Sequence, residues 1–222
     1  MKFKTGILLI AILFLFSCND NNRVKFEKPQ PASVRELKHF GKDIQGVYVK
    51  YSNPNKTMAI FPDYIATNLH IQFRIGRFGL QLDSSAHFDI NNDSALIAYF
   101  KQQNVDARIT GDTIVYSQSI VDTIFMITEN HILKRYKRNY FLNYKFDDNY
   151  WRVKKIKVRG DTLYVGEIYP NDSLLHYDYA SLDTNINEKH AKEYILSPSK
   201  REFKKLMRSK AFAITEKYIK QK

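Results

Sequence analysis

The amino-acid sequence predicts a β-dominated α+β fold, a curved antiparallel meander that forms a sandwich or a partly open barrel. Apolar and polar residues alternate over residues 69–75, which is the pattern of a strand with one buried face. Between residues 105 and 169, short runs rich in β-branched and aromatic residues are separated by turn residues every 8–12 positions or so. The chain of 222 residues is 14% aromatic and contains only 8 glycines, so it can bury a core in which strands predominate.

A tether and a short helix are expected before the sheet. Residues 18–33 lack periodicity and contain two prolines, which predicts a flexible, semi-extended tether. Ser33 and Glu36 then form the Ser-x-x-Glu pattern of a capping box, and Gly41 is placed to end a helix of two turns. A strand over residues 47–51 follows and ends at the turn sequence SNPN.

The alternating strand and an inserted helix come next. The strand is predicted from Leu69, Ile71, Phe73 and Ile75, and the same period resumes at Phe78, Leu80 and Leu82. The GRFG sequence at residues 76–79 between these runs is interpreted as a hairpin turn. In NNDSALIAYFKQQN, Asp93 is the predicted N-cap, and an apolar stripe is formed by Leu96, Ile97 and Phe100. The stretch therefore predicts a helix inserted into the meander.

Three related sequences mark hairpins in the meander. GDTIVYS begins at Gly111, VDTIFMI at Val121 and GDTLYVG at Gly160. Asp and Gly favour turns while Thr and the residues after it favour strands, so each copy predicts a turn followed by a strand. One later strand has apolar residues that cannot share a face at a period of two, and these are Trp151, Val153, Ile156 and Val158. A β-bulge near Lys154 and Lys155 is predicted to restore the register.

The end of the chain is predicted to be helical. Residues 187–196 are interpreted as a short helix. Ser199 and Glu202 form a second capping box, which starts a basic helix expected over about residues 199–220. Its apolar stripe consists of Phe203, Met207, Ala211, Ile214 and Tyr218. We expect residues 34–222 to form one domain, which matches the usual size of a domain.

Lysine and arginine are concentrated in two segments of a chain whose formal net charge is +12. Residues 134–159 contain ten Lys or Arg against two Asp, and residues 200–222 contain nine against two Glu. Such segregation predicts a contact surface for anions; the alternative is that both segments are merely solvated faces of strands and helices. The candidate anion-binding residues are Lys134, Arg135, Lys137, Arg138, Arg152, Lys154, Lys155 and Lys157.

The first 22 residues have the pattern of an export signal. Lys2 and Lys4 precede an uninterrupted apolar run over residues 7–16. Ten residues of helix span about 15 Å, half of a hydrocarbon core about 30 Å thick, so a stable membrane span is not expected. The run ends in Ser17 and Cys18, the one cysteine of the chain, so no disulfide can form within it. An uncleaved anchor that happens to end in cysteine is the alternative.

This segment resembles the signal peptide of bacterial lipoproteins, with Leu15, Ser17 and Cys18 matching the lipobox and Phe16 departing from its usual Ala or Ser. The resemblance implies cleavage after residue 17 and acylation of Cys18. It also implies export and attachment to the cell envelope, at the outer membrane on its periplasmic or surface side. The Lys-, Asn-, Ile- and Tyr-rich composition and the stretch NYFLNYKFDDNYWRVKKIKV are similar to uncharacterised lipoproteins of Bacteroidota.

The rest of the sequence carries no catalytic motif. It lacks His-Glu-x-x-His, Gly-x-Ser-x-Gly and a phosphate-binding glycine loop, and no catalytic residue, metal ligand or cofactor is predicted. We expect a non-enzymatic binding or assembly module whose basic surface meets anionic lipid, lipopolysaccharide or acidic polysaccharide. Export argues against nucleic acid as a partner. The alternatives are a periplasmic hydrolase or sugar-active enzyme with dispersed carboxylates, and an inhibitor or subunit of an envelope protein complex.

Overall fold

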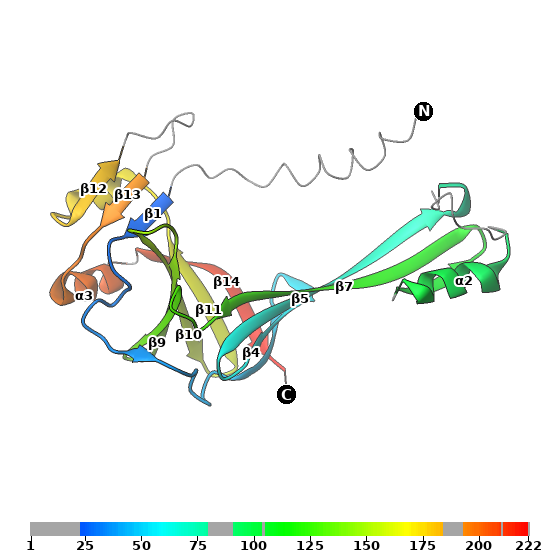
Figure 1. Ribbon diagram of the computed structural model, residues 1–222, viewed down its shortest axis with the longest axis horizontal. Coiled ribbons are helices and arrows are strands. Elements are labelled where there is room, and N and C mark those ends of the chain that lie inside the picture. The colour runs from blue at the N-terminus through cyan, green and yellow to red at the C-terminus, as the bar shows by residue number, and fades with distance from the viewer. Residues whose placement is uncertain (1–22, 80–90, 104, 184–192, 210, 222) are drawn as a thin grey trace.

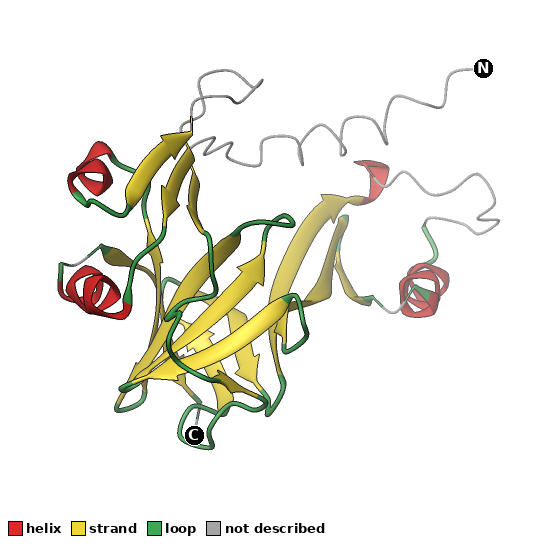
Figure 2. Cartoon of the chain, turned by 60° about the vertical axis from the view of Figure 1, so that its left-hand side comes forward, coloured by secondary structure: helices red, strands yellow, loops and turns green. Residues whose placement is uncertain are grey.

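A computed structural model describes residues 23–79, 91–103, 105–183, 193–209 and 211–221. These residues form one curved, largely antiparallel sheet of 14 strands that is not closed, together with two α-helices. Figures 1 and 2 show the helices at the two ends of an elongated molecule, with the strands between them. The predicted β-dominated class is therefore confirmed.

The sheet follows the order β12-β13-β1-β10-β11-β14-β3-β4-β5-β7-β6, and a branch from β10 continues through β9 and β8 to β2. The strands are β1 (Arg23–Phe26), β2 (Glu36–Leu37), β3 (Gly46–Lys50), β4 (Asn53–Ile60), β5 (Tyr64–Gly76), β6 (Asp106–Thr110), β7 (Thr113–Met126), β8 (His131–Tyr136), β9 (Asn139–Lys145), β10 (Trp151–Arg159), β11 (Thr162–Ile168), β12 (Ala180–Asp183), β13 (Glu193–Leu196) and β14 (Phe212–Lys220). The helices are α2 (Asp93–Gln102), α3 (Lys200–Arg208) and the 3₁₀ turns η2 (Arg77–Gly79) and η3 (Asp172–His176).

Two strands leave the main part of the sheet and form a projecting arm (Figure 1). β5 and β7 pair along their whole length, but β4 flanks β5 only up to Leu69, and β6 flanks β7 only from Ser117 outward. We call residues 70–79, 91–103 and 105–119 the arm, and the other described residues the body. Where neither β4 nor β6 flanks the pair, the arm consists of β5 and β7 alone. We call this two-stranded segment the neck.

The body has two apolar cores on opposite faces of its sheet. The inner core lies within the curve of the sheet and is lined by β3 to β5, by the end of β7 and by β8 to β11 and β14. The outer core is formed where β1, β12, β13, η3 and α3 cover the opposite face. β10 serves both, because Ile156 packs into the inner core and Val153 into the outer one. The predicted bulge at Lys154 and Lys155 was wrong: the pairing of β9 with β10 is continuous, and burial of both faces explains the broken period.

The segment before β3 differs from the prediction. Residues 23–33 are not a flexible tether, since β1 is part of the sheet and Gln30 is 1% exposed. No helix begins at Ser33, because Glu36 and Leu37 pair instead with Lys134 and Leu133 of β8. Contacts with a distant strand thus override a local capping signal.

The C-terminal prediction was half right. α3 has the predicted capping box, in which the Ser199 Oγ accepts a hydrogen bond from the Glu202 N–H. The helix ends at Arg208, however, and residues 212–220 form β14 between β11 and β3. Residues 193–196 form β13 and not a helix, and the preceding residues 187–192 lie outside the described part.

The inserted helix and two of the three hairpins are confirmed. α2 starts one residue from the expected position, with Asn92 as its N-cap. Gly111 and Gly160 occupy two-residue hairpin loops with φ of 58° and 57°, a left-handed conformation that favours glycine. The copy that begins at Val121 lies instead within β7. The strand predicted at residues 69–75 is part of β5, whereas Leu80 and Leu82 fall outside the described residues.

Candidate anion-binding surface

The predicted basic residues do not form one cluster. Lys134 in β8 is 5% exposed, and its Nζ donates hydrogen bonds to the carbonyl oxygens of Pro29 at 3.1 Å and Pro31 at 3.3 Å. Burial lowers the pKa of this ammonium group, while nearby Glu36 has a smaller effect in the opposite direction. Lys134 therefore fixes the turn after β1 and is not available to an external anion.

Its neighbours in the β8–β9 hairpin are partly engaged. The Arg135 guanidinium lies 2.8 Å from Asp43 Oδ2, and the Tyr140 hydroxyl donates to Asp43 Oδ1 at 2.9 Å. Arg138 lines a pocket of about 210 Å³ together with these three residues. Lys137 occupies the hairpin loop with φ of 57° and its Nζ lies 5.7 Å from the Tyr136 ring. This end of the body thus carries one neutralised arginine and two further cations.

β10 divides the other four candidates between its two faces. Successive side chains of a strand point to opposite faces of the sheet, so Arg152 and Lys154 lie on the face of Ile156, and Lys155 and Lys157 on the other. Lys154 Nζ forms an ion pair with Glu167 Oε1 at 2.7 Å. Only Lys155 and Lys157 of the predicted set therefore remain together on the outer face.

Lys155 lies beside a glycine on this outer face. Its cross-strand partner in β11 is Gly166. If residue 166 had a Cβ atom, that atom would lie 3.5 Å from the Lys155 Cε, in contact with the lysine side chain. The Lys155 Nζ is 5.0 Å from the centroid of the Phe212 ring. Burial, and then repulsion by Lys157, lower the pKa of Lys155. An anion bound here would relieve that repulsion.

A lateral row of side chains extends the outer face across three strands. Lys157 pairs with Tyr164 of β11, which pairs in turn with Lys217 of β14. Neighbouring strands are about 4.8 Å apart, so the two lysines lie about 10 Å apart with a tyrosine between them. The Lys217 Nζ also lies 4.3 Å from the centroid of the Tyr51 ring. The row offers two cations beside two aromatic rings.

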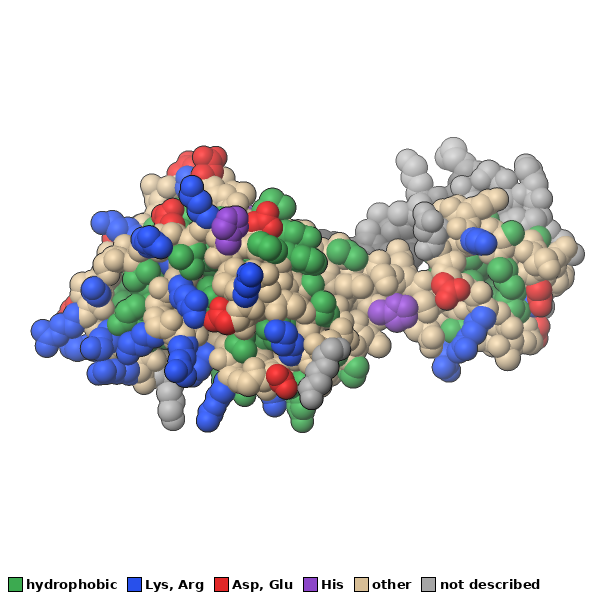
Figure 3. Space-filling view, turned by 90° about the horizontal axis from the view of Figure 1, so that it is seen from below, with side chains coloured by type: hydrophobic (Ala, Val, Ile, Leu, Met, Phe, Trp, Pro, Cys, Tyr) green, Lys and Arg blue, Asp and Glu red, His purple; other side chains and the backbone are tan. Residues whose placement is uncertain are grey.

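α3 adds further cations on the side of Lys155, since the Phe203 ring centroid lies 6.2 Å from that of Phe212, the ring that Lys155 covers. Phe203 and Leu206 turn toward the outer core, which leaves Lys204, Lys205 and Arg208 exposed. α3 ends at Arg208 and β14 begins at Phe212, whose ring lies beneath Lys155. We call Lys155, Lys157, Lys204, Lys205, Arg208 and Lys217 the basic face. Figure 3 shows Lys and Arg gathered over the body, toward the end away from the arm.

No carboxylate forms an ion pair with the basic face in the described part of the chain, although Glu202 of α3 lies near enough to Lys205 to interact with it electrostatically. None of its six cations takes part in an ion pair there. The nearest acidic residues of β11 and β14, Glu167 and Glu216, lie on the opposite face and pair with Lys154 and Lys50. The sequence identified residues 200–222 as basic. Because these residues were interpreted as one long helix, the position of Lys217 in the same lateral row as Lys157 was not predicted.

Three other kinds of functional site are relevant to the function: a metal site, a membrane-spanning helix and the lipidation site. Among the residues that the structure describes, no group of three or more His, Cys, Asp or Glu side chains is placed to hold a metal ion. Neither described α-helix has the length and apolar character of a membrane span. Cys18 lies outside the described residues. The basic face is the candidate functional site of the body.

No protein-family model, curated protein or solved structure matches the chain. The functional assignment is therefore argued from the residues and their geometry. Two features bear on it, the charge of the basic face and the resemblance of residues 1–22 to a lipoprotein signal.

Proposed function

We propose that the protein is an envelope lipoprotein, anchored through lipid on Cys18, whose body binds anionic components of the envelope. The observation that carries the proposal is the basic face, where six cations from β10, α3 and β14 form no ion pair within the described residues. Surface cations that are not neutralised attract polyanions over about one Debye length, which is about 8 Å at physiological salt. Phospholipid headgroups, lipopolysaccharide phosphates and acidic polysaccharide share this chemistry.

The lipid anchor is tested by labelling. In a bacterial host fed a palmitate analogue, the wild-type chain incorporates label and Cys18→Ala does not, because sulfur is the acylation site. Acyl chains contribute about 0.8 kcal/mol per buried CH₂, so loss of the lipid also releases the protein from the membrane fraction. Equal labelling of the two chains contradicts the anchor.

The basic face is tested by heparin retention of the full chain in a neutral detergent. The triple variant Lys155→Glu, Lys157→Glu and Lys217→Glu elutes at much lower salt than wild type. Each lysine–sulfate ion pair that the variant removes reduces the slope of log affinity against log salt by about 0.7–0.9, as counterion release requires. The matched control changes the exposed Lys38, Lys42 and Lys101 to Glu, which gives the same net charge. If both variants elute together, net charge and not the basic face governs retention.

A role as subunit of an envelope complex is the second candidate. The arm and its base expose apolar side chains, with exposed fractions of 40% for Ile97, 48% for Ile120 and 67% for Val121. A photo-crosslinking residue at position 121 tests it in cells, with position 42 of the body as control. A discrete adduct that forms at position 121 and not at 42 supports a protein partner where the arm joins the body. Equal or absent crosslinking at the two positions removes this candidate.

A further inference from the structure

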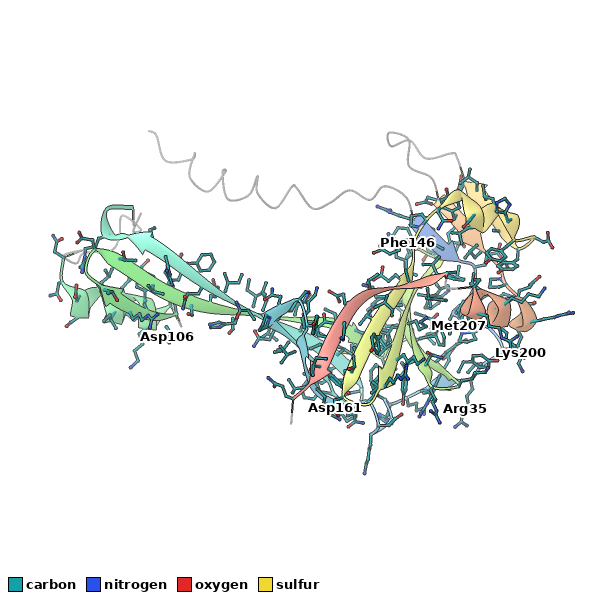
Figure 4. The ribbon with its side chains drawn as sticks, turned by 180° about the vertical axis from the view of Figure 1, so that it is seen from behind. Arg35, Asp106, Phe146, Asp161, Lys200 and Met207 are labelled. Carbon is teal, nitrogen blue, oxygen red and sulfur yellow. The ribbon has the colours of Figure 1, made fainter. Side chains whose placement is uncertain are left out.

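A second group of cations lies where β1, β9 and β10 meet, on the opposite side of the sheet from the basic face. It surrounds Phe146, which directly follows β9. Three charged groups face this one ring: the Arg152 Cζ at 4.0 Å from the ring centroid, the Lys25 Nζ at 4.4 Å and the Arg23 Cζ at 5.2 Å. Figure 4 shows Phe146 beside β1, at the end of the body opposite Asp161.

The carboxylates of this group are engaged by the lysine. The Lys25 Nζ lies 2.5 Å from Glu193 Oε2 and 3.5 Å from Asp147 Oδ2, and both Lys25 and Glu193 are less than 9% exposed. Asp147 is also fixed by its turn, since its Oδ1 accepts hydrogen bonds from the backbone N–H groups of Asn149 and Tyr150 at 2.9 Å. A buried ammonium needs such partners, so these acids are committed to Lys25.

The positive charges of the two arginines are not balanced by ion pairs. Neither Arg23 nor Arg152 takes part in an ion pair within the described residues. Because both guanidinium groups lie beside the same ring, their Cζ atoms are no more than about 9 Å apart. Burial, and then the charge of Arg23, lower the pKa of Arg152, although Glu193 and Glu167 act in the opposite direction. An added anion would replace this repulsion by attraction.

The chemistry of the pair suits an oxyanion such as phosphate. A guanidinium group presents a planar fork of N–H donors that matches the oxygens of phosphate, and stacking on an aromatic ring restricts its orientation before a ligand arrives. Arg23 comes from β1 and Arg152 from β10, two strands that pair at Phe26 and Trp151. The sheet therefore fixes the backbone positions of both arginines, and Phe146 is the common support of their side chains.

The position of Arg23 in the chain indicates the source of the phosphate. Arg23 is five residues after Cys18, and five residues span at most about 18 Å when fully extended. We propose that Arg23 and Arg152 bind the phosphate of an anionic phospholipid headgroup beside the anchor. For the source of the ligand this inference rests on the proposed lipidation, whereas the arginine pair itself is a feature of the fold. Contact with the bilayer would then orient the body as well as retain it.

The test follows the arginine side chains directly by NMR. The full chain carrying Cys18→Ser, in neutral detergent micelles, is titrated with dihexanoyl phosphatidylglycerol, with inorganic phosphate, or with more detergent alone. The Nε–Hε signals of Arg23 and Arg152 are expected to shift and saturate with phosphatidylglycerol, and those of the exposed Arg35 and Arg108 to stay in place. Absence of a saturable shift at Arg23 and Arg152 overturns the site. If inorganic phosphate saturates the shift at the same concentration as phosphatidylglycerol, the ligand of the two arginines is not specifically a lipid.

Variants separate this site from the basic face. Arg23→Gln with Arg152→Gln weakens binding of phosphatidylglycerol about tenfold or more, because two charge-assisted hydrogen-bond donors are removed, and leaves the row of Lys155, Lys157 and Lys217 intact. Arg35→Gln with Arg108→Gln is the matched control and binds as wild type. Phe146→Leu removes the ring but no charge, and is expected to weaken binding while retaining the fold. Unchanged lipid affinity in the double variant contradicts the proposal even if heparin retention depends on the basic face.

Discussion

The body and the arm share the strands β5 and β7, yet they are stabilised in different ways. The body buries apolar side chains on both faces of its sheet, in two cores that join strands far apart in sequence. The arm has one small core around Leu96, Phe100 and Ile114. Partly buried side chains extend this core, such as Tyr116, whose ring stacks on Phe73 at 5.0 Å and on Phe100 at 5.3 Å between ring centroids. Continuity of strands thus does not imply equal stability along them.

The difference indicates two cooperative units within one sheet. The arm joins the body through a neck two strands wide, so few interactions transmit the stability of one to the other. Regions with little buried apolar surface open locally at a lower free energy than the global unfolding of the protein. Trp151 is the one tryptophan of the chain and packs against the outer core. Its fluorescence therefore reports on the body alone.

The largest effect is expected from Phe141→Ala in the body. Phe141 is fully buried, and its ring centroid lies 5.3 Å from that of Phe203 and 6.0 Å from that of Phe212. Removal of a buried phenyl ring costs about 3–5 kcal/mol. The urea midpoint followed by Trp151 falls accordingly, while hydrogen exchange in α2 under native conditions is unchanged. A loss below about 1 kcal/mol would show that the outer core collapses around the cavity.

Leu96→Ala in the arm is expected to have the next largest effect, but a local one. The Leu96 side chain is 0% exposed and packs in the small core that α2 forms with β6 and β7. The loss is about 2–3 kcal/mol, the lower end for such a change, because a small core relaxes more easily. Hydrogen exchange of β6 accelerates while the Trp151 midpoint stays in place. An equal fall of the Trp151 midpoint would mean that body and arm unfold as one unit.

A pair of glycine substitutions gives the finest comparison. Gly111 in the arm and Gly160 in the body have nearly the same φ, and a Cβ at either meets no atom within 4 Å. Alanine therefore costs only the left-handed conformation, about 1 kcal/mol at each position. Gly160→Ala lowers the Trp151 midpoint, and Gly111→Ala accelerates only exchange in the arm. Gly76→Ala, which has open space and no left-handed φ, is the control and is expected within about 0.5 kcal/mol of wild type.

Those features of the fold that depend on neighbouring residues could be predicted from the sequence. The glycine hairpins, the inserted helix and the start of α3 each follow from a few adjacent side chains. The segments that failed depend on distant partners. Residues 212–220 place apolar groups at helical spacing, but they pair with β11 and β3 as a strand, which buries Phe212 in the outer core and Tyr218 in the inner core. Ser33 and Glu36 form a capping pattern that pairing with β8 overrides.

The sequence could predict that two segments are basic, but not which of their side chains lie together on one surface. The sequence located two basic segments, and both contribute to the basic face through Lys155, Lys157 and the residues of α3 and β14. It could not show that Lys134 is buried under Pro29 and Pro31, nor that Arg152 turns toward Phe146. Both depend on which face of a strand is covered, and that is decided by segments far away in the chain.

The neck has a consequence for any partner that binds to both ends of the molecule. A tip carried on a flexible linker would sample many orientations, and binding would have to restrict them at a cost in conformational entropy. Here β5 and β7 join the far end of the arm to the body through paired strands and not through a flexible linker, so fewer orientations are open to it. A ligand that touches both arm and body therefore meets two preorganised surfaces, and engagement of the first raises the effective concentration of the second.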